Sequence, residues 1–271
     1  MAIGMPILSS ESAGQTVPVR KVNDDYKEDF FYREDWLGEP WRSPDPVVLI
    51  HGNEESSLQW YAWVPRLAQE YRLFRPDLPG LGHSSVPAGF VYSLATLATF
   101  VTHVMDRAGL SSAHVVGAKT GAAVAMRFAA DYPQRTRKLV IVGGPASPLR
   151  FENQSPVPQL DRLGSHVSKE MIEYWNRIFK DANPEGVKGL NASLRNFDLA
   201  EEGVLQRIAA PTLVITADRT KMQSVEKVLA YQRLIPNSRL AVIRSDAYHL
   251  AAANPDECAA LTLAFLKEQN T

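Results

Sequence analysis

The residues best suited to chemistry stand in the stretch VVGAKTGAAVAMRFA, which begins at Val115. An apolar run there leads into a turn that holds Lys119 between Gly117 and Gly121, and a helical pattern follows. A neutral lysine amine can attack a ketone or aldehyde, whereas the ammonium form can hold an anion. His249, in the stretch YHLAAANPDE, can act as an acid or a base near neutral pH. These two side chains define a candidate site if the fold brings them together.

Short apolar runs alternate with helical patterns along most of the chain, which is typical of a mostly parallel α/β sheet. The pattern changes from Pro145 to about Leu199, where the chain is polar, helical in places and without a clear strand. This change predicts an insertion over the sheet. The runs that predict strands are 15–22, 28–35, 47–52, the start of 72–85, 113–117, 138–144, 211–218 and 239–243, and the predicted helices are 56–71, 94–109, 122–133, 225–236 and 256–269.

Composition narrows the possible partners. The 271 residues carry a formal net charge of −1 and are 45% hydrophobic, ordinary values for a soluble domain. The sequence has neither a long basic run nor an apolar window of membrane-spanning length, which argues against nucleic-acid and membrane partners. The single cysteine, Cys258, fits a reducing, cytoplasmic setting and is expected to be buried. Residues 1–14 lack the pattern of a signal peptide and are expected to form a mobile tail.

The order of motifs resembles the α/β-hydrolase family from about Val17 to Gln269. HGNEESS at His51 looks like the oxyanion loop of that family, and RPDLPGLGHSS at Arg75 looks like its strand-turn. GAKTG occupies the nucleophile elbow, and YHLAAANPDE looks like the loop of the catalytic histidine. The resemblance implies an α/β-hydrolase fold, a mostly parallel sheet of about eight strands flanked by helices, with a core of 15–144 and 200–271. Residues 145–199 match the small helical cap that roofs the substrate pocket in the family.

The resemblance also implies roles for individual residues. Lys119 stands where the family keeps its nucleophile, and His249 stands where it keeps its general base. The backbone N–H groups of Asn53 and Thr120 correspond to the oxyanion hole. The position of the usual acid is Thr220, which is not an acid. Asp218 lies two residues earlier in the same loop and is a possible residue to orient the histidine. The resemblance therefore does not imply ordinary serine-hydrolase chemistry for this chain.

Three functions stay open for Lys119. Its place at a helix N-terminus and its burial both lower the pKa of the amine, which favours a Schiff base and C–C cleavage or decarboxylation of a carbonyl-bearing, anionic substrate. Alternatively the ammonium clamps an anion while His249 activates water, which gives a hydrolase of an ester, a lactone or a C–C bond. The third possibility is a catalytically silent ligand-binding protein.

Smaller signals complete the prediction. Glu54 and Glu55 lie near the expected pocket, and either can pair with Lys119. His51 is expected to brace its loop. Neither a metal site nor a cofactor site is predicted, and the turn around Lys119 lacks the glycine spacing of a phosphate loop. The expected partner is a small-molecule substrate, and a homodimer is possible.

Overall fold

The computed structural model describes residues 30–149, 158 and 160–269. The predicted tail 1–14, the predicted strand 15–22 and residues 150–157 of the predicted insertion lie outside the described residues.

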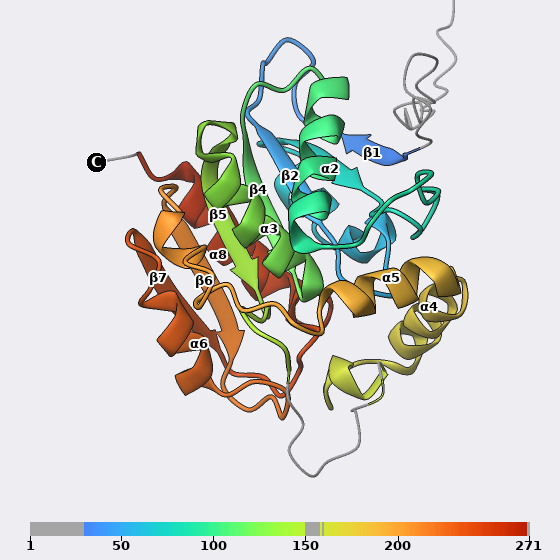
Figure 1. The fold of residues 1–271 in the computed structure, drawn as a ribbon. Helices are drawn as coiled ribbons and strands as arrows, with labels where there is room; N and C mark the ends of the chain where they lie inside the picture. Colours follow the sequence, from blue (N-terminus) through green and yellow to red (C-terminus); the bar gives the residue numbers. More distant parts are fainter. Residues whose placement is uncertain (1–29, 150–157, 159, 270–271) are drawn as a thin grey trace, which may run out of the picture.

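The described residues build one seven-stranded sheet with the order β1-β3-β2-β4-β5-β6-β7 (Figure 1). β1 runs antiparallel to β3, and the remaining pairs are parallel. This arrangement confirms the predicted α/β-hydrolase fold with a mostly parallel sheet. The strands are β1 (Tyr32–Asp35), β2 (Pro46–Ile50), β3 (Arg72–Pro76), β4 (Ala113–Ala118), β5 (Thr136–Val142), β6 (Thr212–Ala217) and β7 (Ser238–Ile243).

Helices cover both faces of the sheet, because the side chains of a strand alternate between them. Val48 and Ile50 of β2 pack on the face covered by α2 (Leu94–Arg107), α3 (Thr120–Asp131) and α6 (Val225–Gln232). Val47 and Leu49 pack on the other face, against α1 (Val64–Leu67) and α8 (Pro255–Lys267). Cys258 of α8 is fully buried in this second layer, as predicted. The short helices η1 (Ser57–Trp60) and α7 (Leu250–Ala253) add buried residues, whereas η2 (Pro133–Arg135) has none.

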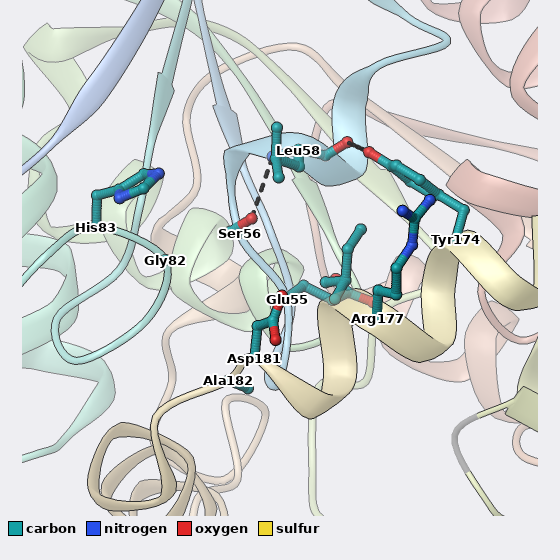
Figure 2. Close-up of a pocket in the computed structure, with 10 residues that line it drawn as sticks. Glu55, Ser56, Leu58, Gly82, His83, Tyr174, Arg177, Asp181 and Ala182 are labelled. Carbon is teal, nitrogen blue, oxygen red and sulfur yellow. Dashed lines mark hydrogen bonds between the residues drawn. The ribbon is translucent and has the colours of Figure 1, made fainter.

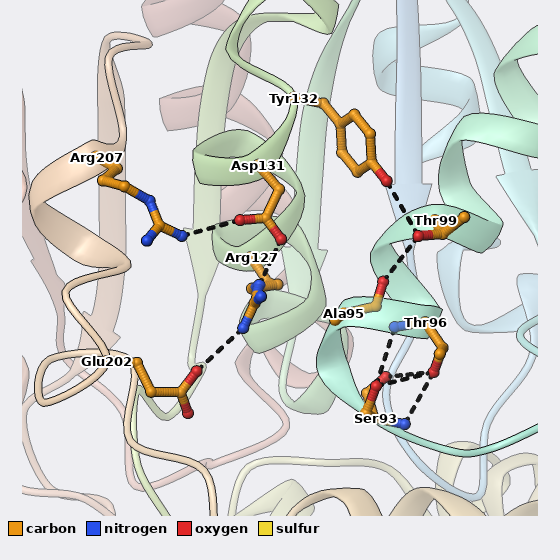
Figure 3. Close-up of polar contacts among 9 residues, drawn as sticks. All are labelled: Ser93, Ala95, Thr96, Thr99, Arg127, Asp131, Tyr132, Glu202 and Arg207. Atoms are coloured by element: carbon orange, nitrogen blue, oxygen red, sulfur yellow. Dashed lines mark hydrogen bonds and ion pairs between the residues drawn. The ribbon is translucent and has the colours of Figure 1, made fainter.

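Side-chain hydrogen bonds fix the start of α2 and tie the end of α3 to a neighbouring segment. Ser93 and Thr96 form a capping box at the start of α2, in which each side chain accepts a hydrogen bond from the backbone N–H of the other, at 3.1 and 2.9 Å (Figure 3). At the far end of α3, Asp131 accepts hydrogen bonds from Arg127 and Arg207. Because Arg207 belongs to η4 (Leu205–Arg207), the end of α3 opposite Lys119 is tied to the neighbouring segment.

Between β5 and β6 the described residues form helices only: η3 (Leu160–Leu163), α4 (Lys169–Lys180), α5 (Pro184–Ser193) and η4. Leu163, Trp175 and Ile178 of this segment form a small apolar cluster with Ala252 of α7. The cluster seats α4 beside the loop that carries His249. The cap over residues 145–199 stays a prediction.

Candidate active site

Lys119 stands at a sharp bend between β4 and α3. Its backbone has φ 52° and ψ −123°, a conformation with positive φ that side-chain-bearing residues rarely adopt. The N–H of Lys119 donates to the carbonyl of Val142 on the adjacent strand over 3.1 Å. A Cβ atom at Gly121 would meet the carbonyl oxygens of Ile50 and His51 at 2.2 and 2.4 Å. Only glycine therefore allows α3 to start this close to β2.

The amine of Lys119 meets a buried carboxylate. Nζ donates to Oε1 of Glu55 over 2.6 Å, and the exposed fractions of the two side chains are 5% and 1%. Burial lowers the pKa of Lys119, and the charge of Glu55 opposes that shift. The amine also lies over the ring of Phe179 in α4, 5.9 Å from its centroid.

His249 approaches the same carboxylate from the other side. It directly precedes α7, and its Nδ1 lies 3.3 Å from Oε1 of Glu55. The rings of Trp175 and Phe179 meet the imidazole edge to face, at centroid distances of 6.0 and 5.8 Å. Burial, and then the positive charges of Lys119 and Arg162, lower the pKa of His249 well below its ordinary value. The imidazole is therefore neutral at pH 7.

The loop after β2 is held by side-chain hydrogen bonds. Nε2 of His51 accepts the N–H of Leu78 over 2.9 Å, and Nδ1 lies 2.7 Å from the carbonyl of Gly52, which assigns the proton to Nδ1. Burial lowers the pKa of His51, in agreement with a neutral ring. His51 therefore braces the loop, as expected. The N–H of Gly52 donates to Oε2 of Glu55 over 2.8 Å. Glu54 has φ 63°, and its N–H donates to Oδ1 of Asn53.

A cavity of about 630 Å³ opens beside the elbow. Lys119 lines it together with Asn53 and Thr120, so three of the residues expected at the site meet there. Arg162 and Arg195 line the same cavity and bias it toward anions. In the part of the chain that the structure describes, His249 does not line this cavity. It lines a smaller gap together with Lys119 and Glu55. Lys119 thus connects the cavity with the histidine.

A second pocket, of about 350 Å³, is lined by Glu55 (Figure 2). It is also lined by Ser56, by Leu58 of η1, and by Tyr174 and Arg177 of α4. The hydroxyl of Tyr174 donates to the carbonyl of Leu58 over 3.2 Å, which joins α4 to the core. Glu55 is the residue that faces this pocket and also contacts Lys119.

The structure directs Asp218 elsewhere than expected. Its carboxylate accepts the N–H of Ser245 over 2.8 Å and contacts Arg219 at 3.3 Å. The carboxylate beside His249 is that of Glu55. The sequence indicated Glu55 only as a possible partner of Lys119, because no motif of the family places an acid there. The contact between Glu55 and His249 forms only in the folded chain, and no pattern in the sequence indicates it.

Within the part of the chain that the structure describes, no cluster of three or more His, Cys, Asp or Glu side chains is arranged to hold a metal ion. A search of the same residues finds no helix with the length and apolarity needed to cross a membrane.

Comparisons with known proteins agree with the fold and the motif order. The family described as "alpha/beta hydrolase fold" matches residues 45–167. The chain is 31% identical to the 2-hydroxy-6-oxo-2,4-heptadienoate hydrolase of Pseudomonas putida over 36% of this chain and 37% of that protein, so this match spans about a third of the relative's length. It is 26% identical to the 2-hydroxy-6-oxo-6-phenylhexa-2,4-dienoate hydrolase of Burkholderia cepacia, over 82% of this chain and 87% of that protein.

Among solved structures, a thermophilic esterase from Thermogutta terrifontis superposes with a TM-score of 0.76 at 22% identity, over 89% of this chain and 93% of that chain. The fold and the four motifs define an α/β-hydrolase-fold protein. The family match over residues 45–167 supports the same class, and the two relatives and the structural neighbour named above are hydrolases.

Proposed function

We propose that this chain is a cofactor-independent enzyme that cleaves a C–C bond, or removes a carboxyl group, in a small anionic substrate with a ketone or aldehyde. The observation that carries the proposal is the position of Lys119. Its amine is buried at the elbow and contacts Glu55, and the residue lines a cavity that also holds Arg162 and Arg195. The names of the two dienoate hydrolases describe substrates with an oxo group and a carboxylate, which agrees with this charge.

The proposed chemistry begins with a neutral amine. Nζ attacks the carbonyl carbon, a carbinolamine forms, and loss of water leaves a protonated imine that withdraws electrons from the adjacent bonds. The bond between the α carbon and the departing carbon then breaks. Its electron pair moves into an enamine, and the departing carbon leaves as carbon dioxide or as an aldehyde or ketone. A proton returned to the enamine carbon, followed by hydrolysis of the imine, frees the product and the lysine. His249 is the proposed acid and base of these proton transfers, and the N–H groups of Asn53 and Thr120 stabilise the oxyanion of the carbinolamine step.

A second candidate is hydrolysis without a covalent intermediate. The 2.6 Å contact between Lys119 and Glu55 has the length of an ammonium–carboxylate pair, and the relatives are hydrolases. In this case Lys119 holds the substrate as a cation, and His249 activates water.

Reductive trapping separates the two candidates. The protein is incubated with small oxo acids, such as acetoacetate and pyruvate, and treated with borohydride, and the modified residue is located by peptide mass spectrometry. The first candidate requires substrate mass on Lys119. Lys138, a second buried lysine whose Nζ donates to the carbonyl of Phe265, provides the matched control through Lys138→Arg. Turnover that survives Lys119→Arg, with no trapped adduct, contradicts the Schiff base and supports the cationic clamp. Ligand binding without turnover, unaffected by His249→Ala, contradicts both.

A further inference from the structure

The carboxylate of Glu55 occupies the point where the two proposed catalytic side chains meet. Oε1 lies 2.6 Å from Nζ of Lys119 and 3.3 Å from Nδ1 of His249. Oε2 is held separately by the N–H of Gly52 over 2.8 Å. Oε2 is therefore anchored to the backbone, while Oε1 accepts a hydrogen bond from the amine and faces the imidazole.

The contact between Nζ and Oε1 gives the proton of Lys119 an acceptor within the site. An amine can attack a carbonyl only when its lone pair is free, yet loss of a proton to bulk solvent is slow at a side chain that is 95% buried. A shift of one proton from Nζ to Oε1 converts the ionic pair into a neutral pair. The lone pair is freed, no proton leaves the site, and the net charge stays the same. A low dielectric lowers the cost of this neutral state.

The surrounding charges act on the pair from several elements. The guanidinium of Arg162 in η3 lowers the pKa of both Lys119 and His249, and Glu54 in the loop raises that of Lys119. Glu55 itself raises the pKa of Lys119 and, together with Asp77, that of His51. Because His249 stays neutral at rest, the resting proton belongs to the pair of Lys119 and Glu55.

We infer that Glu55 is the positioning acid of this site: it receives the proton of Lys119 on Oε1 and orients His249 through its charge, 3.3 Å from Nδ1, in place of an acid at the end of a strand. The inference rests on the proposed function only in taking Lys119 as the reacting amine. Glu55 also lines the second pocket, which lies between the loop after β2 and α4 (Figure 2).

The test measures Lys119 without any substrate. The intact protein is reductively methylated with formaldehyde and dimethylamine–borane over a range of pH, and the rate at Lys119 is read by peptide mass spectrometry. Glu55→Gln removes the charge that keeps a proton on the amine. We expect the midpoint of the rate profile to fall by about one pH unit or more, which is about a tenfold gain in rate below the wild-type midpoint. Glu55→Asp, which keeps the charge, should restore the wild-type midpoint in part. Glu173→Gln, on an exposed face of α4, is the matched control and should change nothing.

A second measurement reports on His249 and does not need the Glu55 variants to fold. In Lys119→Met, Glu55 faces His249 without the competing amine, so the pKa of His249 should rise, as read from the ¹⁵N chemical shifts of its ring. The inference is overturned if Glu55→Gln leaves the Lys119 midpoint unchanged in a folded protein, or if the His249 shifts of Lys119→Met titrate as in the wild type. Because neither readout involves turnover, a failure of the proposed function alone leaves both shifts in place.

Discussion

The side-chain amide of Asn53 donates to Oδ1 of Asn191 over 2.9 Å and so joins the loop after β2 to α5 of the predicted cap. Both residues line the cavity beside Lys119. The position of α5 over the elbow thus depends in part on one hydrogen bond between two uncharged side chains.

This bond should be measurable as a coupling energy. Asn53→Ala and Asn191→Ala each remove one partner, and a double-mutant cycle by urea unfolding should give a coupling of about 0.5–1.5 kcal/mol. Asn191→Asp keeps the acceptor and should retain most of it. Additive effects of the two alanine substitutions would show that the contact contributes nothing to stability.

The backbone at the elbow is strained, and its strain can be separated from the chemistry of the lysine. Lys119→Ala and Lys119→Gly both remove the amine, but only glycine adopts φ 52° without penalty. We expect Lys119→Gly to be the more stable variant by about 1 kcal/mol in chemical denaturation. Equal stabilities, or the reverse order, would contradict the strain.

The close approach of α3 to β2 predicts a larger effect at Gly121. A methyl group there would meet two backbone carbonyl oxygens, which cannot move aside as a side chain can. Gly121→Ala should lower the free energy of unfolding by about 3 kcal/mol or more. Gly109→Ala is the control: its φ is also positive, at 69°, but open space surrounds it, so about 1 kcal/mol is expected. Thermal and urea unfolding of the two variants would check the difference.

The stability of the fold should fall in mild acid. Burial lowers the pKa of His114 from 6.5 to about 4. Below pH 6.5 the unfolded chain binds a proton that the folded chain does not, so the contribution of His114 is complete above pH 6.5. It is lost as the pH falls from 6.5 toward 4, to a total of up to about 3 kcal/mol.

The measurement is urea unfolding across this range. His114→Gln should flatten the dependence on pH, although the lowered pKa values of His51 and His249 leave a slope of the same sign. Between pH 7 and 8 the curves of variant and wild type should run parallel. A variant that keeps the full acid slope would show that His114 does not contribute.

The two arginines that line the cavity should select for charge in the substrate. Arg195→Leu and Arg162→Gln are each expected to weaken binding of an anionic oxo acid about tenfold or more, the loss of a charge-assisted hydrogen bond. The backbone carbonyl of Arg162 accepts the N–H groups of Tyr248 and His249, both over 2.8 Å, and a side-chain substitution leaves these bonds in place. Calorimetric titration with acetoacetate and with its neutral methyl ester would compare the two charges. An equal loss for both ligands would contradict electrostatic selection.

The fold could be predicted because its signals are local. The alternation of apolar runs and helical patterns predicted the strands from β2 to β7, and the glycines around Lys119 predicted the bend that the structure has. Each of these features depends on side chains a few positions apart, where spacing alone carries the information.

The partner of the histidine could not be predicted in this way. Glu55 and His249 are separated by almost two hundred positions, and their contact depends on how α7 and the loop after β2 meet. Asp218 is only a possible orienting residue by sequence, because it lies two residues before the usual acid position, and its carboxylate accepts the N–H of Ser245. Distance along the chain was a poor guide to distance in space at this point.

The close approach of α3 to β2 at Gly121 fixes the backbone bend at position 119, whichever side chain stands there. Exchanging the residue at position 119 would place a different functional group at this bend without a change in the backbone around it. A serine introduced there would already find an imidazole close by and a buried acid against that ring. This architecture can therefore serve as a starting point for converting one reaction type into another through very few changes.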